Sequence, residues 1–308
     1  DGAIAYGVEL GDVTEPLGVY GQAKLSVVKS SVLGLDARIT ARLTHSLFPK
    51  AAVREYSAGP GFRKALADKL YLDGQILAYT AQETEALALS SVDRASVGLS
   101  EKVESAGTKL QTEIVWDNRD SGIEAMHGSF ASLHLEYAPD VLGASHEWLS
   151  LKTDLRGFRS LSPSLSLALR AAGSWVLGDG DAGIPLHRRL FGGGAYGFRG
   201  FGRQHLSPEL NGLLVGGKSM VEGSVEARFL PLRLLYGAVA FVDVGANSVD
   251  NNPFANGVYA AVGVGARLRT FYIPVSFDLS YRVLDESALI SPLQGEPWSF
   301  FVRLGEAF

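Results

Sequence analysis

The chain has 308 residues, no cysteine and a formal net charge of -5, which excludes a disulfide framework and a thiolate metal site and argues against nucleic acid as a partner. No apolar run approaches the roughly 20 residues of a membrane-spanning helix, and the longest candidate, residues 234–242, is about half that length. A hydrophobic content of 46% therefore leaves two fold classes, a large soluble β protein and a membrane β-barrel.

Alternation of apolar and polar residues is the main pattern along the chain. In residues 33–44, for example, leucine, alanine and isoleucine alternate with glycine, aspartate, arginine and threonine. Such segments are about ten residues long, whereas strands of soluble proteins usually have about five or six residues. Because about ten tilted residues cross the hydrocarbon layer of a bilayer, the pattern favours transmembrane strands with a lipid-facing and a lumenal side.

Turn signals separate the alternating segments, and no stretch has a convincing helical period. An antiparallel barrel that closes first strand to last needs an even number of strands, so we expect about 16. The missing strand is expected within residues 44–70, where Gly59-Pro60-Gly61 interrupts the alternation. The prediction is an all-β chain whose residues 1–308 form a single transmembrane antiparallel barrel. The fifteen segments are 3–10, 17–28, 33–44, 51–62, 69–81, 86–100, 108–117, 128–138, 147–157, 164–177, 219–229, 234–243, 258–269, 272–283 and 298–308.

Residues 190–206 are the most informative segment of the chain. They combine three consecutive glycines with the tetrad Phe198-Arg199-Gly200-Phe201. Glycine has no Cβ atom, so this segment can approach other backbone closely and adopt positive φ angles. A lone cation in such a setting is expected to be held by fixed acidic partners.

Two acidic residues follow the tetrad on neighbouring predicted strands. Glu226 alternates with the apolar Val225 and Ala227, and Asp243 follows the apolar Val242. The alternation therefore directs both carboxylates to the lumenal side, where Arg199 would need them.

The tetrad and the preceding Leu190-Phe191-Gly192-Gly193-Gly194 resemble the loop signature of the BamA/TamA superfamily, the bacterial surface-antigen barrels. The resemblance is specific from about residue 110 to residue 308, and earlier it lies only in the strand pattern. Four further pieces agree in chain order: Trp116-Asp117-Asn118-Arg119-Asp120 with the family's D-x-R-D element, Gly216-Gly217 with Ser224-Val225-Glu226-Ala227-Arg228 as its GG…E-x-R strand, Phe241-Val242-Asp243-Val244-Gly245 as F-x-D-x-G, and an aromatic last strand closing on Phe308.

The resemblance implies that an extracellular loop folds into the lumen and that Arg199 binds acids on the two strands that follow. We interpret this contact as a lock that fixes the loop; the alternative is a generic lumenal salt bridge that only stabilises the barrel. For the rim motif Asp117, Arg119 and Asp120, a functional role and simple charge neutralisation stay equally open.

The seam between the first and last strands is a second candidate for mechanism. The first segment, which contains Tyr6, is short, and the last contains Gly305 three residues before Phe308. A glycine weakens a strand and permits a bend. We therefore expect this seam to open laterally or to template an incoming strand, and a cysteine cross-link across it would test the idea.

The resemblance implies insertion or translocation of polypeptides at the outer membrane of a Gram-negative bacterium. Expected partners are lipopolysaccharide, phospholipid and client polypeptides, with no nucleic acid, and a homodimer stays open. Family members normally carry POTRA domains before the barrel, and no such stretch precedes residue 3 here, which puts insertase activity in question.

The alternative function is a diffusion pore or a structural barrel, although an inserted loop argues against an open pore. An enzyme such as a lipase barrel lacks support, because no G-x-S-x-G, Walker or H-E-x-x-H pattern occurs. The six histidines show no metal-ligand spacing. We therefore expect no catalytic residue, no metal and no cofactor.

Overall fold

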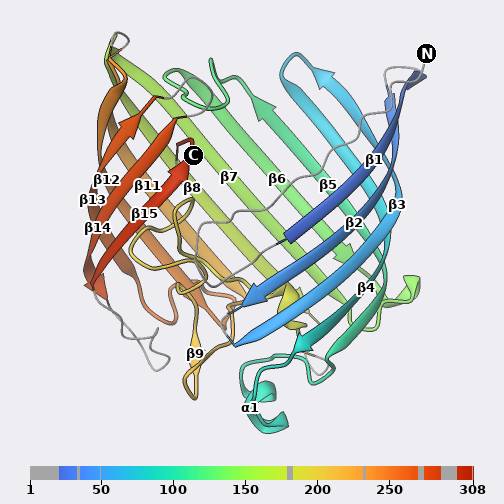
Figure 1. Ribbon diagram of the computed structural model, residues 1–308. Helices are drawn as coiled ribbons and strands as arrows, with labels where there is room; N and C mark the ends of the chain where they lie inside the picture. Colours follow the sequence, from blue (N-terminus) through green and yellow to red (C-terminus); the bar gives the residue numbers. More distant parts are fainter. Residues whose placement is uncertain are drawn as a thin grey trace. The chain divides into compact units, whose positions relative to one another are not determined.

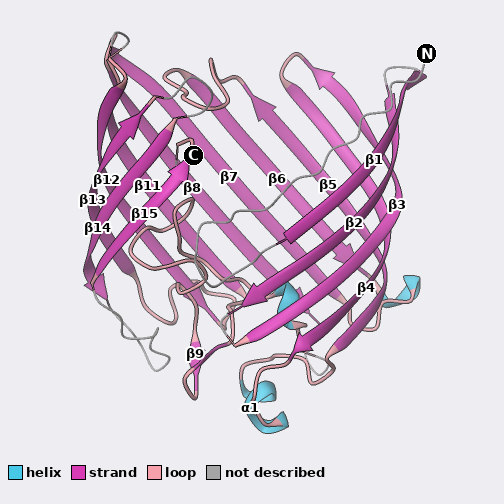
Figure 2. Cartoon of the chain, viewed as in Figure 1, coloured by secondary structure: helices cyan, strands magenta, loops and turns pink. Residues whose placement is uncertain are grey.

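The computed structural model describes residues 21–32, 35–48, 50–178, 183–231, 234–269, 274–285, 297–306 and 308. Strands dominate these residues (Figure 2). Thirteen strands form one sheet in which hydrogen-bonded neighbours follow chain order (Figure 1). They are β1 (Gly21–Val32), β2 (Leu35–Phe48), β3 (Ala51–Ala67), β4 (Leu70–Glu85), β5 (Glu104–Asp117), β6 (Gly128–Ala138), β7 (Trp148–Ser162), β8 (Leu165–Gly178), β11 (Ser219–Phe229), β12 (Tyr236–Ser248), β13 (Tyr259–Leu268), β14 (Val275–Asp285) and β15 (Trp298–Leu304).

The remaining elements are short. β9 (Glu209–Leu210) and β10 (Leu213–Leu214) form a small hairpin of their own. α1 spans Ser91–Ser96, and single 3-10 turns occur at Asp140–Leu142 and Leu186–Arg188. None of the helices in the described ranges is long and apolar enough to cross a membrane.

The chain divides into two compact units. Unit 1 comprises residues 1–115, 132–152 and 176–189, and unit 2 comprises residues 116–131, 153–175 and 190–308. β1 to β4 pair antiparallel in unit 1. In unit 2, β8, β11, β12, β13, β14 and β15 form a second antiparallel series.

The predicted extra strand within residues 44–70 is absent, because β2 and β3 fill that range and β3 continues through Pro60. Pro60 faces Ile39 of β2, and the pairing of β3 with β4 skips from Ala58 to Gly61. A proline has no N–H to give the ladder, so the skip is its expected effect. At Gly59 a Cβ atom would lie 1.9 Å from the Ile76 carbonyl oxygen, so glycine is required beside the proline.

Segment 86–100 was expected to be a strand and is instead a loop that contains α1. Ser90 caps this helix, because its side chain accepts a hydrogen bond from the Asp93 amide at 3.1 Å. Local capping of this kind competes with strand pairing, and the alternation in this segment does not reveal it.

Burial in unit 2 is inverted relative to a soluble protein. On β11 the polar Ser224, Glu226 and Arg228 are buried, whereas Val225 and Phe229 are about half exposed, at 46% and 50%. β12 repeats the pattern, with Asp243 buried and Val242 and Val244 about half exposed. We call the two sides the polar face and the apolar face. Exposed apolar side chains suit a lipid environment, and the buried polar side carries the candidate site.

Candidate functional site

The candidate site is the loop between β8 and β11, whose residues 190–218 belong to unit 2. Backbone bridges pair Leu190 with Gly217 and Gly192 with Leu206. The Asn247 side chain of β12 donates to the carbonyl oxygens of Leu190 and Leu206, each at 2.8 Å. These bonds fasten the stem of the loop to the polar face.

Glycines are required at the turn and inside the tetrad. Gly193 and Gly194 have φ angles of 89° and 102°, which favour glycine. At Gly200 a Cβ atom would lie 2.4 Å from the Phe198 ring and 3.1 Å from the Cβ atom of Ala261. The close approach of the tetrad to β13 therefore depends on the missing side chain.

The Arg199 guanidinium is fully buried and surrounded by acceptors on three strands. Its Nε and Nη2 atoms donate to the two carboxylate oxygens of Asp243 at 2.7 and 2.8 Å. Nη1 donates to Glu226 at 2.5 Å and to Asp278 at 3.3 Å, and Nη2 also donates to Ser224 at 3.1 Å. An arginine has five N–H groups, so each of them has an acceptor here.

Hydrogen bonds to the backbone also hold the tetrad and the glycines before it. Glu222 of β11 accepts from the amides of Gly193 at 3.4 Å and Phe198 at 3.2 Å. The Ser280 hydroxyl of β14 donates to the Arg199 carbonyl oxygen. The loop is therefore fixed along its length and not only at one ion pair.

The charges around Arg199 balance. Arg228 pairs with Glu226 at 2.6 Å, and Arg267 pairs with Asp278 at 2.7 Å and with Glu306 at 2.8 Å. Burial opposes the charged form of Arg199, but hydrogen bonding to Asp243 and the charges nearby hold its pKa above the ordinary value. A buried network of this kind is tolerated only when its charges are paired. Its members are the arginines Arg199, Arg228, Arg267 and Arg303 and the acids Glu226, Asp243, Asp278 and Glu306.

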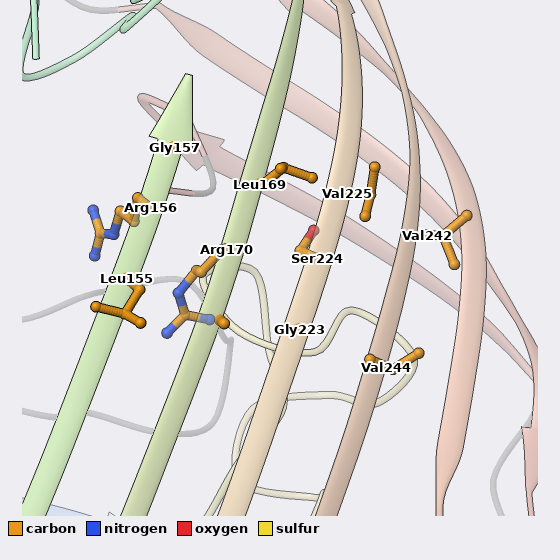
Figure 3. Close-up of a pocket in the computed structure, with 11 residues that line it drawn as sticks. Leu155, Arg156, Gly157, Leu169, Arg170, Gly223, Ser224, Val225, Val242 and Val244 are labelled. Atoms are coloured by element: carbon orange, nitrogen blue, oxygen red, sulfur yellow. The ribbon is translucent and has the colours of Figure 1, made fainter. Parts of the chain in front are cut away.

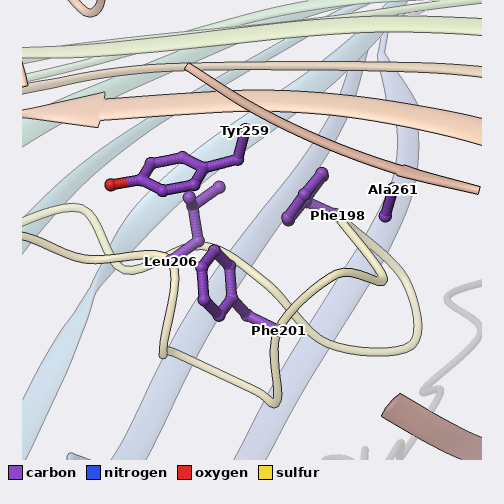
Figure 4. Close-up of a cluster of buried hydrophobic side chains, with 5 residues drawn as sticks. All are labelled: Phe198, Phe201, Leu206, Tyr259 and Ala261. Atoms are coloured by element: carbon purple, nitrogen blue, oxygen red, sulfur yellow. The ribbon is translucent and has the colours of Figure 1, made fainter. Parts of the chain in front are cut away.

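Both aromatic residues of the tetrad pack against β13. Figure 4 shows Phe198, Phe201 and Leu206 of the loop gathered beside Tyr259 and Ala261. The ring centroids of Phe198 and Phe201 are 5.7 Å apart, and those of Phe201 and Tyr259 are 5.2 Å apart. This apolar contact removes Phe198 and Phe201 from water, with exposed fractions of 1% and 5%.

The apolar face opposite the loop carries a shallow depression of about 400 Å³ (Figure 3). It forms where small residues adjoin, because Gly223 of β11 lies in register between Ala171 and Val244. Its apolar walls include Leu155, Leu169, Val225, Val242 and Val244. The lining also includes Arg156, Arg170 and Ser224, but the contacts of the tetrad lie on the polar face.

The rim motif makes separate contacts at the turn after β5. Asp117 accepts from Nε and Nη2 of Arg119, both at 2.9 Å. Asp120 accepts from the amides of Met126 at 3.0 Å and His127 at 3.2 Å. Burial opposes the charge of Asp120, but these amide donors lower its pKa below the ordinary value.

The seam residues divide between described and undescribed parts of the chain. Tyr6 lies outside the described residues. β15 ends at Leu304 rather than at Phe308, because Gly305 adopts a φ angle of 85°. Phe308 lies on the polar face, with its ring centroid 6.2 Å from that of Phe158. The expected strand over 298–308 is thus corrected to Trp298–Leu304.

Sequence reasoning missed several contributors to the site. Asp278, Ser224 and Ser280 all bind the tetrad, and Phe241 lies against the guanidinium. The alternation of β14 could have found Asp278, because the residue stands between Phe277 and Leu279 and so belongs to the polar face. No cluster of histidine, aspartate and glutamate within the described part of the chain could hold a metal ion.

Comparison with known proteins links this geometry to a family. Residues 34–288 match the Omp85 superfamily domain. The fold is similar to that of BamA from Haemophilus ducreyi lacking POTRA domains 1-3, with a TM-score of 0.77 and 14% identity over 93% of this chain and 62% of that chain. It is also similar to CdiB from Acinetobacter baumannii, with a TM-score of 0.58 and 11% identity over 92% of this chain and 50% of that chain. Comparison with curated protein sequences gave no match.

The chain spans less than two thirds of each of these two chains, and at these identities the likeness concerns the fold alone. It confirms the predicted all-β antiparallel fold class. The superfamily match, which covers well over half of the chain, confirms the resemblance found in the sequence. This protein therefore belongs to the Omp85 superfamily of non-enzymatic β-barrels, which reside in the outer membrane of Gram-negative bacteria.

Proposed function

We propose that this chain, as a single membrane domain, inserts or translocates client polypeptides at the outer membrane, and that the Arg199 contact is the lock that holds its loop in place. The observation that carries the proposal is the buried guanidinium with acceptors for all five N–H groups on Glu226, Asp243, Asp278 and Ser224. Membership of the Omp85 superfamily and the fold shared with BamA and CdiB support it.

A lock explains the site better than a generic stabilising pair. A salt bridge between two strands would stabilise the sheet without any loop residue, yet here Arg199 comes from the loop and the strands supply only acceptors. Removing one partner of a buried ion pair costs roughly 3–5 kcal/mol, because an uncompensated charge stays behind. The loop therefore leaves the polar face only if a large energetic cost is met elsewhere.

Reconstitution tests the proposal. The chain would be folded into phospholipid vesicles, and a small outer-membrane barrel protein would be added in its urea-unfolded state. Protease protection of the added protein should develop faster than in empty vesicles, and Arg199→Ala should lose most of this acceleration. Wild-type vesicles that behave like empty ones would remove the insertion proposal for this chain.

Planar-bilayer conductance separates this function from a diffusion pore. The plugged arrangement predicts small, erratic conductance that rises when residues 192–206 are deleted. Large and stable ohmic channels in the wild type would favour the pore instead. In that case the Arg199 contact would be a stabilising feature of a channel wall.

A further inference from the structure

A second arginine of the same β8–β11 connection is ion-paired on unit 1. Arg188 lies in the 3-10 turn Leu186–Arg188, eleven positions before Arg199. Its Nη1 atom donates to Glu136 of β6 at 2.6 Å, and its Nη2 atom donates to Glu55 of β3 at 2.7 Å. The guanidinium therefore bridges two carboxylates on separate strands of unit 1, with a different nitrogen atom directed at each.

The surroundings of Arg188 form a built site. The Arg188 Cζ atom lies 4.3 Å from the centroid of the Trp148 ring, and Trp148 is 1% exposed. Lys109 of β5 lies 2.5 Å from Glu55 and 3.6 Å from Glu136. Arg188 and Lys109 thus both contact the two carboxylates, and His134 lies 3.9 Å from Glu136. Loss of Arg188 would leave these acids with one cation fewer, and removing one partner of a buried ion pair is strongly destabilising.

Backbone contacts place the neighbouring residues on unit 1 as well. The Ile184 amide donates to Gly98 at 2.9 Å, and the Ser100 amide donates to Ile184 at 3.0 Å. Arg189 donates from Nη2 to the carbonyl oxygen of Val97 at 2.8 Å. Residues 184–189, which we call the first arm of the loop, are therefore held apart from the tetrad and by different acceptors.

We propose that Arg188 is a second and independent anchor of the loop, which positions the first arm on Glu55 and Glu136 whether or not Arg199 is bound. The inference deepens the proposed function, on which it rests, because release of the whole connection, residues 184–218, then requires both anchors to open. Breaking the Arg199 contact alone loosens only the second arm, residues 190–218, and leaves the first arm on unit 1.

Lys109 offers a matched control. Like Arg188 it binds Glu55, but it comes from strand β5 and not from the loop. Lys109→Met removes one cation from the same cluster and leaves the bridge from Arg188 to both acids in place. A general stabilising role for the cluster predicts that the two substitutions loosen the first arm equally, whereas an anchor predicts that Arg188→Ala loosens it far more than Lys109→Met.

Thiol labelling tests the inference, because the chain has no native cysteine. Ile184→Cys reports on the first arm and Ala195→Cys on the second, and both positions are buried, at 3% and 7% exposure. Labelling by a maleimide would be timed in the folded full chain in vesicles. Arg188→Ala should raise the rate at position 184 by at least about tenfold and leave position 195 unchanged. Arg199→Ala should do the reverse, and Lys109→Met should accelerate labelling at position 184 by much less than Arg188→Ala and leave position 195 unchanged.

The outcomes separate the two proposals. Unchanged labelling at position 184 in Arg188→Ala, or equal acceleration in Lys109→Met, overturns the second anchor. Unchanged labelling at position 195 in Arg199→Ala overturns the lock and leaves the second anchor standing. If Arg188→Ala does not fold, the labelling rate of the cysteine at position 184 is measured in Arg188→Lys and in Glu136→Gln instead. Each should give intermediate acceleration, and no acceleration in either overturns the inference.

Discussion

The Cζ atom of Arg199 lies 3.4 Å from the centroid of the Phe241 ring. Phe241 stands two residues before Asp243 on the polar face of β12, so one strand supplies both the aromatic ring and the carboxylate that binds the guanidinium edge. An arginine held in this way has its face against an aromatic ring and its N–H groups on acids. Lysine lacks the planar fork that both contacts require.

The first prediction concerns Arg199 itself. Arg199→Ala should lower the free energy of unfolding in urea by about 3–5 kcal/mol, because buried acids lose their counter-charge. The free energy of unfolding of Arg199→Lys should lie between those of the wild type and Arg199→Ala, since lysine keeps the charge and loses the two-ended contact with Asp243. Strand content measured by circular dichroism should stay near that of the wild type.

Protease sensitivity of the loop is the second readout for this substitution. Cleavage within residues 190–218 should be faster in Arg199→Ala than in the wild type. Arg203→Ala, which changes a partly exposed arginine of the same loop, should leave protection closer to that of the wild type than Arg199→Ala does. Equal protection in Arg199→Ala and the wild type would show that Arg199 does not hold the loop.

The second prediction uses the glycine opposite Phe241. At Gly263 of β13 a Cβ atom would lie 2.2 Å from the Phe241 ring and 2.7 Å from the Leu279 carbonyl oxygen. Gly263→Ala should therefore destabilise the fold by about 1–3 kcal/mol and accelerate labelling at Ala195→Cys, because the ring must shift against Arg199. The double variant Gly263→Ala/Phe241→Leu should recover part of the lost stability. The recovery stays partial, because the contact of the new Cβ atom with the Leu279 carbonyl oxygen persists.

Gly157→Ala is the matched control for this overpacking. It is also a strand glycine, but nothing lies within 4 Å of the Cβ position. Its substitution should change the free energy of unfolding by no more than about 0.5 kcal/mol. If Gly263→Ala and Gly157→Ala behave alike, the ring does not press on the guanidinium.

Much of this site could be predicted from local alternation, and the rest depends on distant pairing. Alternation directs Glu226 and Asp243 to the polar side, because side-chain direction in a strand has a period of two. It does not say that Asp278, two strands beyond β12, reaches the same guanidinium. That contact depends on strand register across β12, β13 and β14, which no local pattern specifies.

The first arm was missed for a related reason. Arg188 stands outside the tetrad, and its acids Glu55 and Glu136 stand 133 and 52 positions away in the chain. A local sequence pattern does not predict a contact between residues so far apart in the chain. The glycine at 305 could be recognised as a break in the last strand, but the contacts of Phe308 with Phe158 and Arg228 could not, because these residues lie far from Phe308 in the chain.

The third prediction concerns pH and His187 of the first arm. Burial first, and then the charge of Arg188, lowers the pKa of His187 from 6.5 to about 3. The folded state therefore holds this imidazole neutral, while the unfolded state protonates it below pH 6.5. Its contribution to stability is complete above pH 6.5 and is lost as the pH falls from 6.5 toward 3, at up to about 1.4 kcal/mol per pH unit.

Urea unfolding between pH 4 and pH 8 checks this prediction. Carboxylates also titrate in that range, so the comparison is between the wild type and His187→Gln. The wild type should lose more stability than His187→Gln as the pH falls below 6.5, and the two curves should run parallel above it. Parallel curves over the whole range would show that His187 is not held neutral.

The last prediction concerns the rim motif, for which the sequence left a functional and a structural role equally open. Asp120 closes the turn over residues 121–127, because its Oδ1 atom accepts from the amides of both Met126 and His127. Asp120→Ala should cost about 1 kcal/mol and speed hydrogen exchange at these two amides. Asp120→Asn keeps an acceptor oxygen and should retain most of the protection.

The charge of Asp120 adds a pH dependence that separates it from asparagine. Because the folded-state pKa of Asp120 lies below its ordinary value, its contribution is present above the ordinary pKa and is lost as the pH falls through the folded-state value. Protection of the two amides should therefore weaken in acid for the wild type and not for Asp120→Asn. If Asp120→Ala exchanges as slowly as the wild type, the turn does not need this carboxylate. The functional reading of Asp117, Arg119 and Asp120 would then be the stronger one, and vesicle insertion by the same variant would decide it.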